Sequence, residues 1–157
     1  MSETEKLKCY VTKVLGYILG DISQLKEKGV TVSFPYLFLS FAGIDFLGGL
    51  EHGFQRGNSQ KRSTWFISTW MPKINSRYIF SDSYNTQSQA SYLYNFARSG
   101  LIHMASVQRS VVVATDASLQ KYHLGYSHDG NSKVFIHPFL FAEEFEKASG
   151  LYLEDVY

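Results

Sequence analysis

The sequence predicts a mainly α protein, a helical bundle with a small antiparallel β-hairpin or three-stranded appendage near residues 110–137. Several segments carry apolar residues at helical spacing, whereas this one region is β-branched and contains a hairpin signal. The length of 157 residues fits one compact domain, which we assign to residues 1–157.

The first helix is expected over residues 4–28. Its apolar positions recur at intervals of three and four, which is typical of one buried stripe on a helix. These positions are Leu7, Tyr10, Val11, Val14, Leu15, Ile18, Ile22 and Leu25. Gly29 is expected to end the helix.

The segment from Phe34 to Leu50 is apolar on nearly every face, and Pro35 suits the first turn of a helix. Its length approaches that of a short membrane span. A carboxylate at Asp45 would cost about 2.5 to 3.5 kcal/mol at mid-bilayer, and basic flanks are missing. We therefore interpret the segment as the central core helix and expect no membrane association.

Residues 51–63 lose the apolar pattern, and their glycine, asparagine and serine content predicts a surface loop. Arg56, Lys61 and Arg62 form a small basic cluster there, a candidate binding site. A short helix is expected to follow from about residue 64 until Pro72, with irregular structure over residues 72–86.

A further helix is expected over residues 86–106, where Leu93, Ala97, Leu101 and Met104 share one face. Residues 110–115 are β-branched, and residues 122–127 and 133–138 flank a turn at 128–132 that predicts a hairpin.

A three-residue hairpin loop from Asp129 to Asn131 would place His123 directly opposite His137. No third ligand at a defined spacing accompanies this pair, so we expect neither a metal nor another cofactor. The last helix is expected over residues 139–148, with Gly150 as its stop. Phe141, Phe145 and Ala148 should point inward.

Composition narrows the class of protein. Apolar residues make up 45% of the chain and charged residues 18%, which argues against disorder. The net charge of +1 is too small to attract a polyanion without a local site. The single cysteine, Cys9, and the polar first residues fit a cytoplasmic protein. Common phosphate-loop, hydrolase and zinc-protease motifs are missing.

One motif remains, YNFARSGLIHMA at residues 94–105, in which four residues separate Arg98 from His103. This resembles the Arg-x4-6-His signature of HEPN domains, an all-helical superfamily that includes metal-independent ribonucleases, toxins of bacterial defence systems and non-catalytic binding proteins. The resemblance implies an RNA-binding protein or metal-independent endoribonuclease of a prokaryotic stress or defence system. Ser99 stands where the family most often has a polar residue, commonly asparagine, and is a candidate for binding.

The chemistry of RNA cleavage suits these residue types. His103 is expected to act as the base or acid at the ribose 2′-hydroxyl, and Arg98 to hold the scissile phosphate through a bidentate fork. Residues five apart on a helix point about 140° apart, so one copy does not form a compact site. The resemblance implies that two copies line a cleft between the protomers of a homodimer.

The alternative is a non-catalytic protein-interaction domain in which Arg98 is structural. Asp45 is the one acid in the central apolar helix, and a buried carboxylate needs a partner. On this alternative Arg98 pairs with Asp45 in the core. The identity of the group that compensates Asp45 therefore bears on the function.

Overall fold

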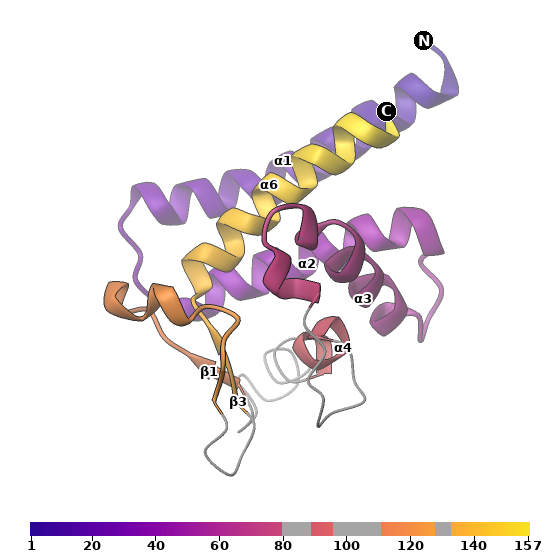
Figure 1. Cartoon of the computed structure of the whole chain (residues 1–157). Helices are drawn as coiled ribbons and strands as arrows, with labels where there is room; N and C mark the ends of the chain where they lie inside the picture. Colours follow the sequence, from indigo (N-terminus) through magenta and orange to yellow (C-terminus); the bar gives the residue numbers. More distant parts are fainter. Residues whose placement is uncertain (80–88, 96–110, 128–132) are drawn as a thin grey trace.

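The computed structural model of the protein describes residues 1–79, 89–95, 111–127 and 133–157 (Figure 1). The helices are α1 (Glu3–Glu27), α2 (Ser33–His52), α3 (Ser59–Thr69), α4 (Gln89–Leu93) and α6 (Pro138–Val156). Short 3₁₀ helices are η1 (Met71–Lys73), η2 (Ser76–Ile79) and η4 (Ala117–Tyr122), and the strands are β1 (Val111–Val113), β2 (Tyr126–Ser127) and β3 (Lys133–Ile136). The predicted mainly α class is confirmed.

α1 begins at a capping box, in which the Ser2 side chain and the Glu5 backbone and side chain bond reciprocally. Only part of its predicted stripe reaches the core. Val11, Leu15 and Ile22 are buried, whereas the more N-terminal Leu7 and Tyr10 are exposed. α1 runs antiparallel to α6, so that both chain termini lie at the same end of the molecule (Figure 1).

α2 lies at the centre, in contact with α1, α3 and α6. Two of its glycines allow these contacts: a Cβ on Gly43 would strike the Phe145 ring, and one on Gly48 would strike the Arg62 backbone. Among the described residues, α2 is the one helix whose length and composition would suit a membrane span, and half of that span is buried in the protein. The core helix predicted from the sequence is confirmed.

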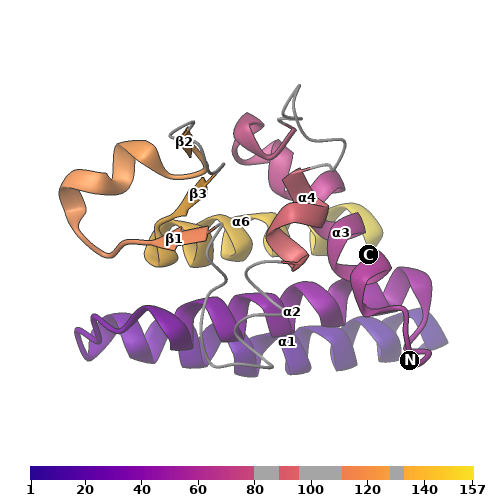
Figure 2. The ribbon, with the colours of Figure 1, turned by 90° about the horizontal axis from the view of Figure 1, so that it is seen from below.

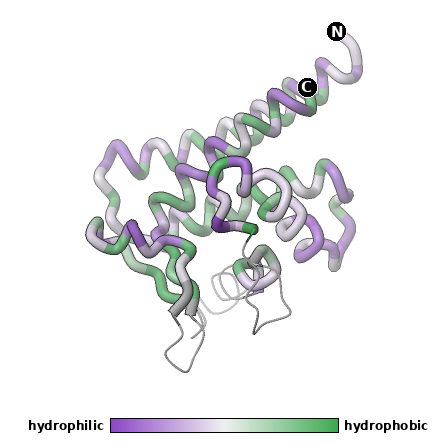
Figure 3. The backbone as a smooth tube through the Cα atoms, viewed as in Figure 1, coloured by the Kyte–Doolittle hydropathy of each residue, from purple (hydrophilic) through white to green (hydrophobic). Residues whose placement is uncertain are grey.

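Figure 2 shows α1 and α2 side by side, with the sheet over one end of this pair and α3 and α4 over the other. Hydrophobic stretches follow α2, α6 and the strands, where these elements meet (Figure 3). One continuous cluster of buried apolar side chains joins the helices to the sheet.

α6 continues to Val156, so the prediction that Gly150 ends this helix is wrong. A glycine inside a helix costs about 1 kcal/mol relative to alanine. Burial of Tyr152 outweighs that cost, because its ring is 2% exposed and lies 5.3 Å from Trp70 and 6.1 Å from Phe66. The prediction that Phe141, Phe145 and Ala148 point inward is confirmed.

The sheet has the strand order β1-β3-β2. β2 and β3 form the predicted antiparallel hairpin with the predicted register, since Tyr126 pairs with Val134 and Ser127 with Lys133. β1, however, runs parallel to β3, which corrects the expectation of an antiparallel appendage. The chain reaches β2 through η4, a helix that the sequence analysis missed, and Leu124, between η4 and β2, has a φ of 59°.

The loop predicted over residues 51–63 is shorter than expected. α2 extends to His52, and α3 begins at Ser59, so only residues 53–58 connect them. α4 lies at the start of the helix predicted over residues 86–106, most of which lies outside the described residues.

Candidate functional site

The predicted catalytic residues Arg98 and His103, together with Ser99, lie outside the described residues. The structure describes the elements that flank them, α4 before and β1 after. α4 is anchored in the core, because Tyr92 is 2% exposed and Leu93 is fully buried. It packs against α3 and η2, which fixes the start of the segment that carries the motif.

Asp45 forms an ion pair with Arg62. The arginine approaches side-on, with Nη2 at 2.8 Å from Oδ2 and Nε at 3.2 Å from Oδ1. The Oδ1 atom also accepts hydrogen bonds from the hydroxyls of Ser59 at 2.8 Å and Ser63 at 3.3 Å. Three of these four bonds reach Oδ1 and one reaches Oδ2, so both oxygens are hydrogen-bonded. Asp45 is charge-compensated, but by Arg62; the expected partner, Arg98, lies outside the described residues.

The prediction that Arg62 belongs to an exposed binding cluster is wrong, because this residue is only 8% exposed. Its Nη1 atom donates to the carbonyl oxygens of Gly53 at 3.5 Å and Gln55 at 3.3 Å. The early start of α3 is the physical reason, since it turns Arg62 onto α2 and toward Asp45. Both edges of the guanidinium are therefore used to hold the α2–α3 connection.

Arg56 and Lys61, the other two members of the predicted cluster, are exposed. Neither forms an ion pair among the described residues. Arg56 and Lys61 remain candidates for contact with an anionic partner. Arg62, the third cation of the predicted cluster, is buried and does not join them.

A buried polar cluster around Glu144 joins α6 to η2 and to the end of η4. Its Oε2 atom accepts hydrogen bonds from the Tyr78 hydroxyl at 2.6 Å and from His123 Nε2 at 3.0 Å. Its Oε1 atom accepts from Asn75 Nδ2 at 2.7 Å. Three side chains, from two segments of the chain, thus converge on one carboxylate.

The ring of His123 is held in one tautomer. Its Nδ1 atom accepts the backbone N–H of His137 at 3.0 Å, so the proton of the neutral ring lies on Nε2 and is donated to Glu144. The predicted juxtaposition of His123 and His137 is confirmed. The contact between the two residues is a hydrogen bond from the His137 backbone to the His123 ring. The His137 ring nitrogens have no partner among the described residues.

The cluster shifts the pKa values of its members. Burial acts to raise the pKa of Glu144, but the hydrogen bond from His123, with the bonds from Tyr78 and Asn75, leaves it below its usual value. Burial, followed by the negative Glu144 nearby, raises the pKa of Tyr78 well above its ordinary value. Burial, followed by the neighbouring His123, lowers the pKa of His137, against a smaller opposing effect of the Thr115 backbone.

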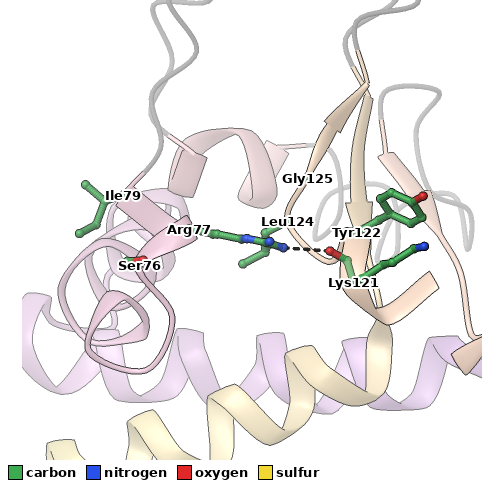
Figure 4. A pocket seen from close by; sticks show the side chains of 7 residues that line it. All are labelled: Ser76, Arg77, Ile79, Lys121, Tyr122, Leu124 and Gly125. Carbon is green, nitrogen blue, oxygen red and sulfur yellow. Dashed lines mark hydrogen bonds between the residues drawn. The ribbon is translucent and has the colours of Figure 1, made fainter. Parts of the chain in front are cut away.

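A cavity of about 590 Å³ opens between η2 and the segment that joins η4 to β2 (Figure 4). Arg77 extends across it, and its Nη1 atom donates to the carbonyl oxygens of His123 at 2.8 Å and Lys121 at 3.2 Å. The side chains of Lys121 and Tyr122 project from the far side of their own segment, away from this guanidinium. The cavity is lined by Ser76, Arg77, Ile79, Lys121, Tyr122, Leu124 and Gly125.

Sequence reasoning missed the Glu144 cluster and the cavity. A signal for Glu144 existed, since it lies three residues after Phe141 and four before Ala148 and so shares their inward face. No comparable signal marks Arg77, because its contacts lie in a segment more than forty residues away along the chain.

No group of three or more side chains suited to a metal ion occurs in the described part of the chain. Besides the exposed ion pairs Lys26–Glu146 and Lys147–Glu143, the described polar groups include the ion pair at Asp45, the cluster at Glu144 and the Arg77 guanidinium that faces a cavity. Comparison of the chain with protein-family models, curated proteins and solved structures gave no match.

Proposed function

We propose that this protein is a homodimeric RNA-binding protein of the HEPN type that cleaves single-stranded RNA without a metal ion. The motif residues Arg98 and His103 supply the chemistry, and the mainly helical fold agrees with the all-helical superfamily that the motif resembles. The three-stranded sheet is an addition to that plan.

The observation that carries the proposal is the ion pair between Asp45 and Arg62. The strongest structural role for Arg98 was to compensate this acid, but Arg62 already neutralises its charge, and Ser59 and Ser63 add hydrogen bonds. Asp45 therefore does not need Arg98 as a counter-ion. Removing this competing role favours a phosphate-binding role for the arginine.

The proposed reaction uses the ribose 2′-hydroxyl of the substrate as the nucleophile. His103 removes its proton, the 2′-oxygen attacks the adjacent phosphorus, and the bond to the 5′-oxygen of the next nucleotide breaks. The leaving 5′-oxygen takes up a proton from water and becomes a hydroxyl. Arg98 stabilises the charge on the phosphate in the transition state. The products are a 2′,3′-cyclic phosphate and a 5′-hydroxyl, the same with or without a chelator.

The test is cleavage of labelled single-stranded RNA by the purified protein in the presence of chelator. Arg98→Ala and His103→Ala are each expected to slow cleavage by about a hundredfold to ten-thousandfold. Lys6→Ala is the control, because it removes an exposed cation outside the motif and outside the candidate binding cluster and should leave most activity. Equal inactivity of wild type and both motif variants, with unchanged folding, would overturn the catalytic proposal.

The oligomeric state gives an independent test, because the proposal needs two copies of the motif at one cleft. Sedimentation should give a dimer at micromolar concentration. A monomer well above that concentration would remove the composite site and with it the cleavage mechanism.

A second candidate is a protein-interaction domain without catalysis, and one observation favours it. Leu7, Tyr10 and Tyr17 lie along one side of α1 and are 47%, 58% and 64% exposed. An exposed apolar stripe of this kind is typical of a contact surface. Tyr10→Ser together with Tyr17→Ser would weaken such a contact and leave RNA cleavage unchanged.

A further inference from the structure

We propose that the cavity at Arg77 is a subsite for one unpaired nucleotide, whose phosphate binds to the free edge of the Arg77 guanidinium. The choice of a nucleotide rests on the proposed function, since it takes the ligand to be part of an RNA strand. The site itself rests on the geometry of the cavity and on a comparison of Arg77 with Arg62.

The two arginines make the same contacts through one edge. In each, Nη1 donates to two backbone carbonyl oxygens that lie two residues apart, those of Gly53 and Gln55 for Arg62 and those of Lys121 and His123 for Arg77. In Arg62 the other edge, formed by Nε and Nη2, grips the Asp45 carboxylate. In Arg77 the same edge has no partner among the described residues.

The nearby carboxylate does not fill that edge. Glu144 accepts its hydrogen bonds from Asn75, Tyr78 and His123, and none from Arg77. The free edge of Arg77 thus presents two parallel N–H donors, the arrangement that matches two oxygens of a phosphate or carboxylate.

The guanidinium is already in position before a ligand arrives. Its bond to the His123 carbonyl oxygen is 2.8 Å long, and His123 is 2% exposed and fixed by Glu144 and by the His137 backbone. A donor held in this way loses little conformational entropy when it binds an anion.

The remaining wall suits a flat base. A cavity of about 590 Å³ falls in the range of small-molecule sites. Of the apolar lining residues, Ile79 is 70% exposed and Leu124 is 3% exposed, so Ile79 provides most of the accessible apolar surface, and Ser76 adds a hydroxyl. A phosphate alone would leave this apolar surface uncovered, so the cavity favours a nucleotide over a bare anion.

The experiment measures binding of uridine 5′-monophosphate, inorganic phosphate, acetate and a short single-stranded oligouridylate by calorimetry. Wild type is expected to bind the mononucleotide more tightly than phosphate. Arg77→Ala and Arg77→Lys should each weaken mononucleotide binding by about tenfold to a hundredfold, because lysine keeps the charge but lacks the paired donors. Lys6→Ala removes an exposed cation on α1, outside the cavity; it is the charge control and should change the affinity less than twofold.

Each outcome decides the proposal. Arg77→Lys that unfolds normally and binds the mononucleotide like wild type would overturn it, as would equal losses in Arg77→Lys and Lys6→Ala. Binding of acetate but not of the mononucleotide would overturn the ligand class. RNA cleavage that depends on Arg98 while Arg77→Lys leaves its KM unchanged would remove the subsite alone. Mononucleotide binding that depends on Arg77, without any RNA cleavage, would remove the catalytic proposal alone.

Discussion

Arg62 and Arg77 are two arginines with one pattern of backbone contacts and different surroundings. Arg62 is 8% exposed and faces Asp45, whereas Arg77 is exposed and faces a cavity. In the first, every edge of the guanidinium serves the packing of α3 on α2. In Arg77, the edge formed by Nε and Nη2 has no partner among the described residues. An anion-binding site requires a pair of donors of this kind. Sequence composition alone does not distinguish the two.

The largest expected effect is on stability at Arg62. Arg62→Ala leaves a mostly buried carboxylate with only two hydroxyl donors, so we expect the free energy of unfolding to fall by about 3 to 5 kcal/mol. Arg77→Ala should lower it by about 1 kcal/mol, because its bonds are exposed to water. Urea denaturation of both variants measures the difference.

The double variant Asp45→Leu with Arg62→Leu is the control for this comparison. It removes both charges together and should recover much of the stability that Arg62→Ala loses. Equal losses in Arg62→Ala and Arg77→Ala would contradict the division into a structural and a binding arginine.

An intermediate effect on stability is expected at acidic pH, through Glu144. This carboxylate holds His123, whose carbonyl oxygen accepts a hydrogen bond from Arg77. The pKa of Glu144 is lower in the folded than in the unfolded protein, because the bonds from its three donors outweigh burial. Its contribution is therefore present above the usual pKa near 4.5 and is lost as the pH falls through the lower folded value.

Glu144→Gln tests this contribution by removing the titrating group. At neutral pH the variant should lose about 1 to 3 kcal/mol, since a buried donor is left without its acceptor. Its stability should then vary less than that of wild type below about pH 4.5. If the free energy of unfolding of the two proteins fell in parallel below about pH 4.5, Glu144 would not be the group that stabilises this region.

The smallest effect on stability is expected at His137, whose backbone N–H donates to the His123 ring. Its pKa is lowered by burial and by His123, so the folded protein favours the neutral ring. Stability from this residue is present above the ordinary value of 6.5 and decreases as the pH falls from there through the folded pKa.

His137→Phe keeps the backbone N–H that bonds His123 and removes only the ring nitrogens, which have no partner among the described residues. We expect a change within about 1 kcal/mol at neutral pH and a flatter stability profile between about pH 7 and 5. Thermal unfolding across that range measures it. A profile as steep as that of wild type would assign the dependence to another group.

Local sequence signals determined much of the fold. The spacing of Val11, Leu15 and Ile22 identified the buried side of α1, and the turn residues after Ser127 identified the hairpin and its register. These features depend on residues close together in the chain, where helical period and turn geometry leave few alternatives.

Tertiary structure decided the features that link distant elements. The sequence showed that Asp45 needs a cation, but only the packing of α3 on α2 selected Arg62. α6 passes through Gly150 because Tyr152 finds aromatic partners on α3 and beside it. β1 pairs parallel to β3, an orientation that the β-branched run of β1 does not specify by itself. The free edge of Arg77 likewise depends on which carbonyl oxygens and carboxylates the fold places near the guanidinium. Local sequence patterns do not predict such contacts, because the residues involved are distant in the chain.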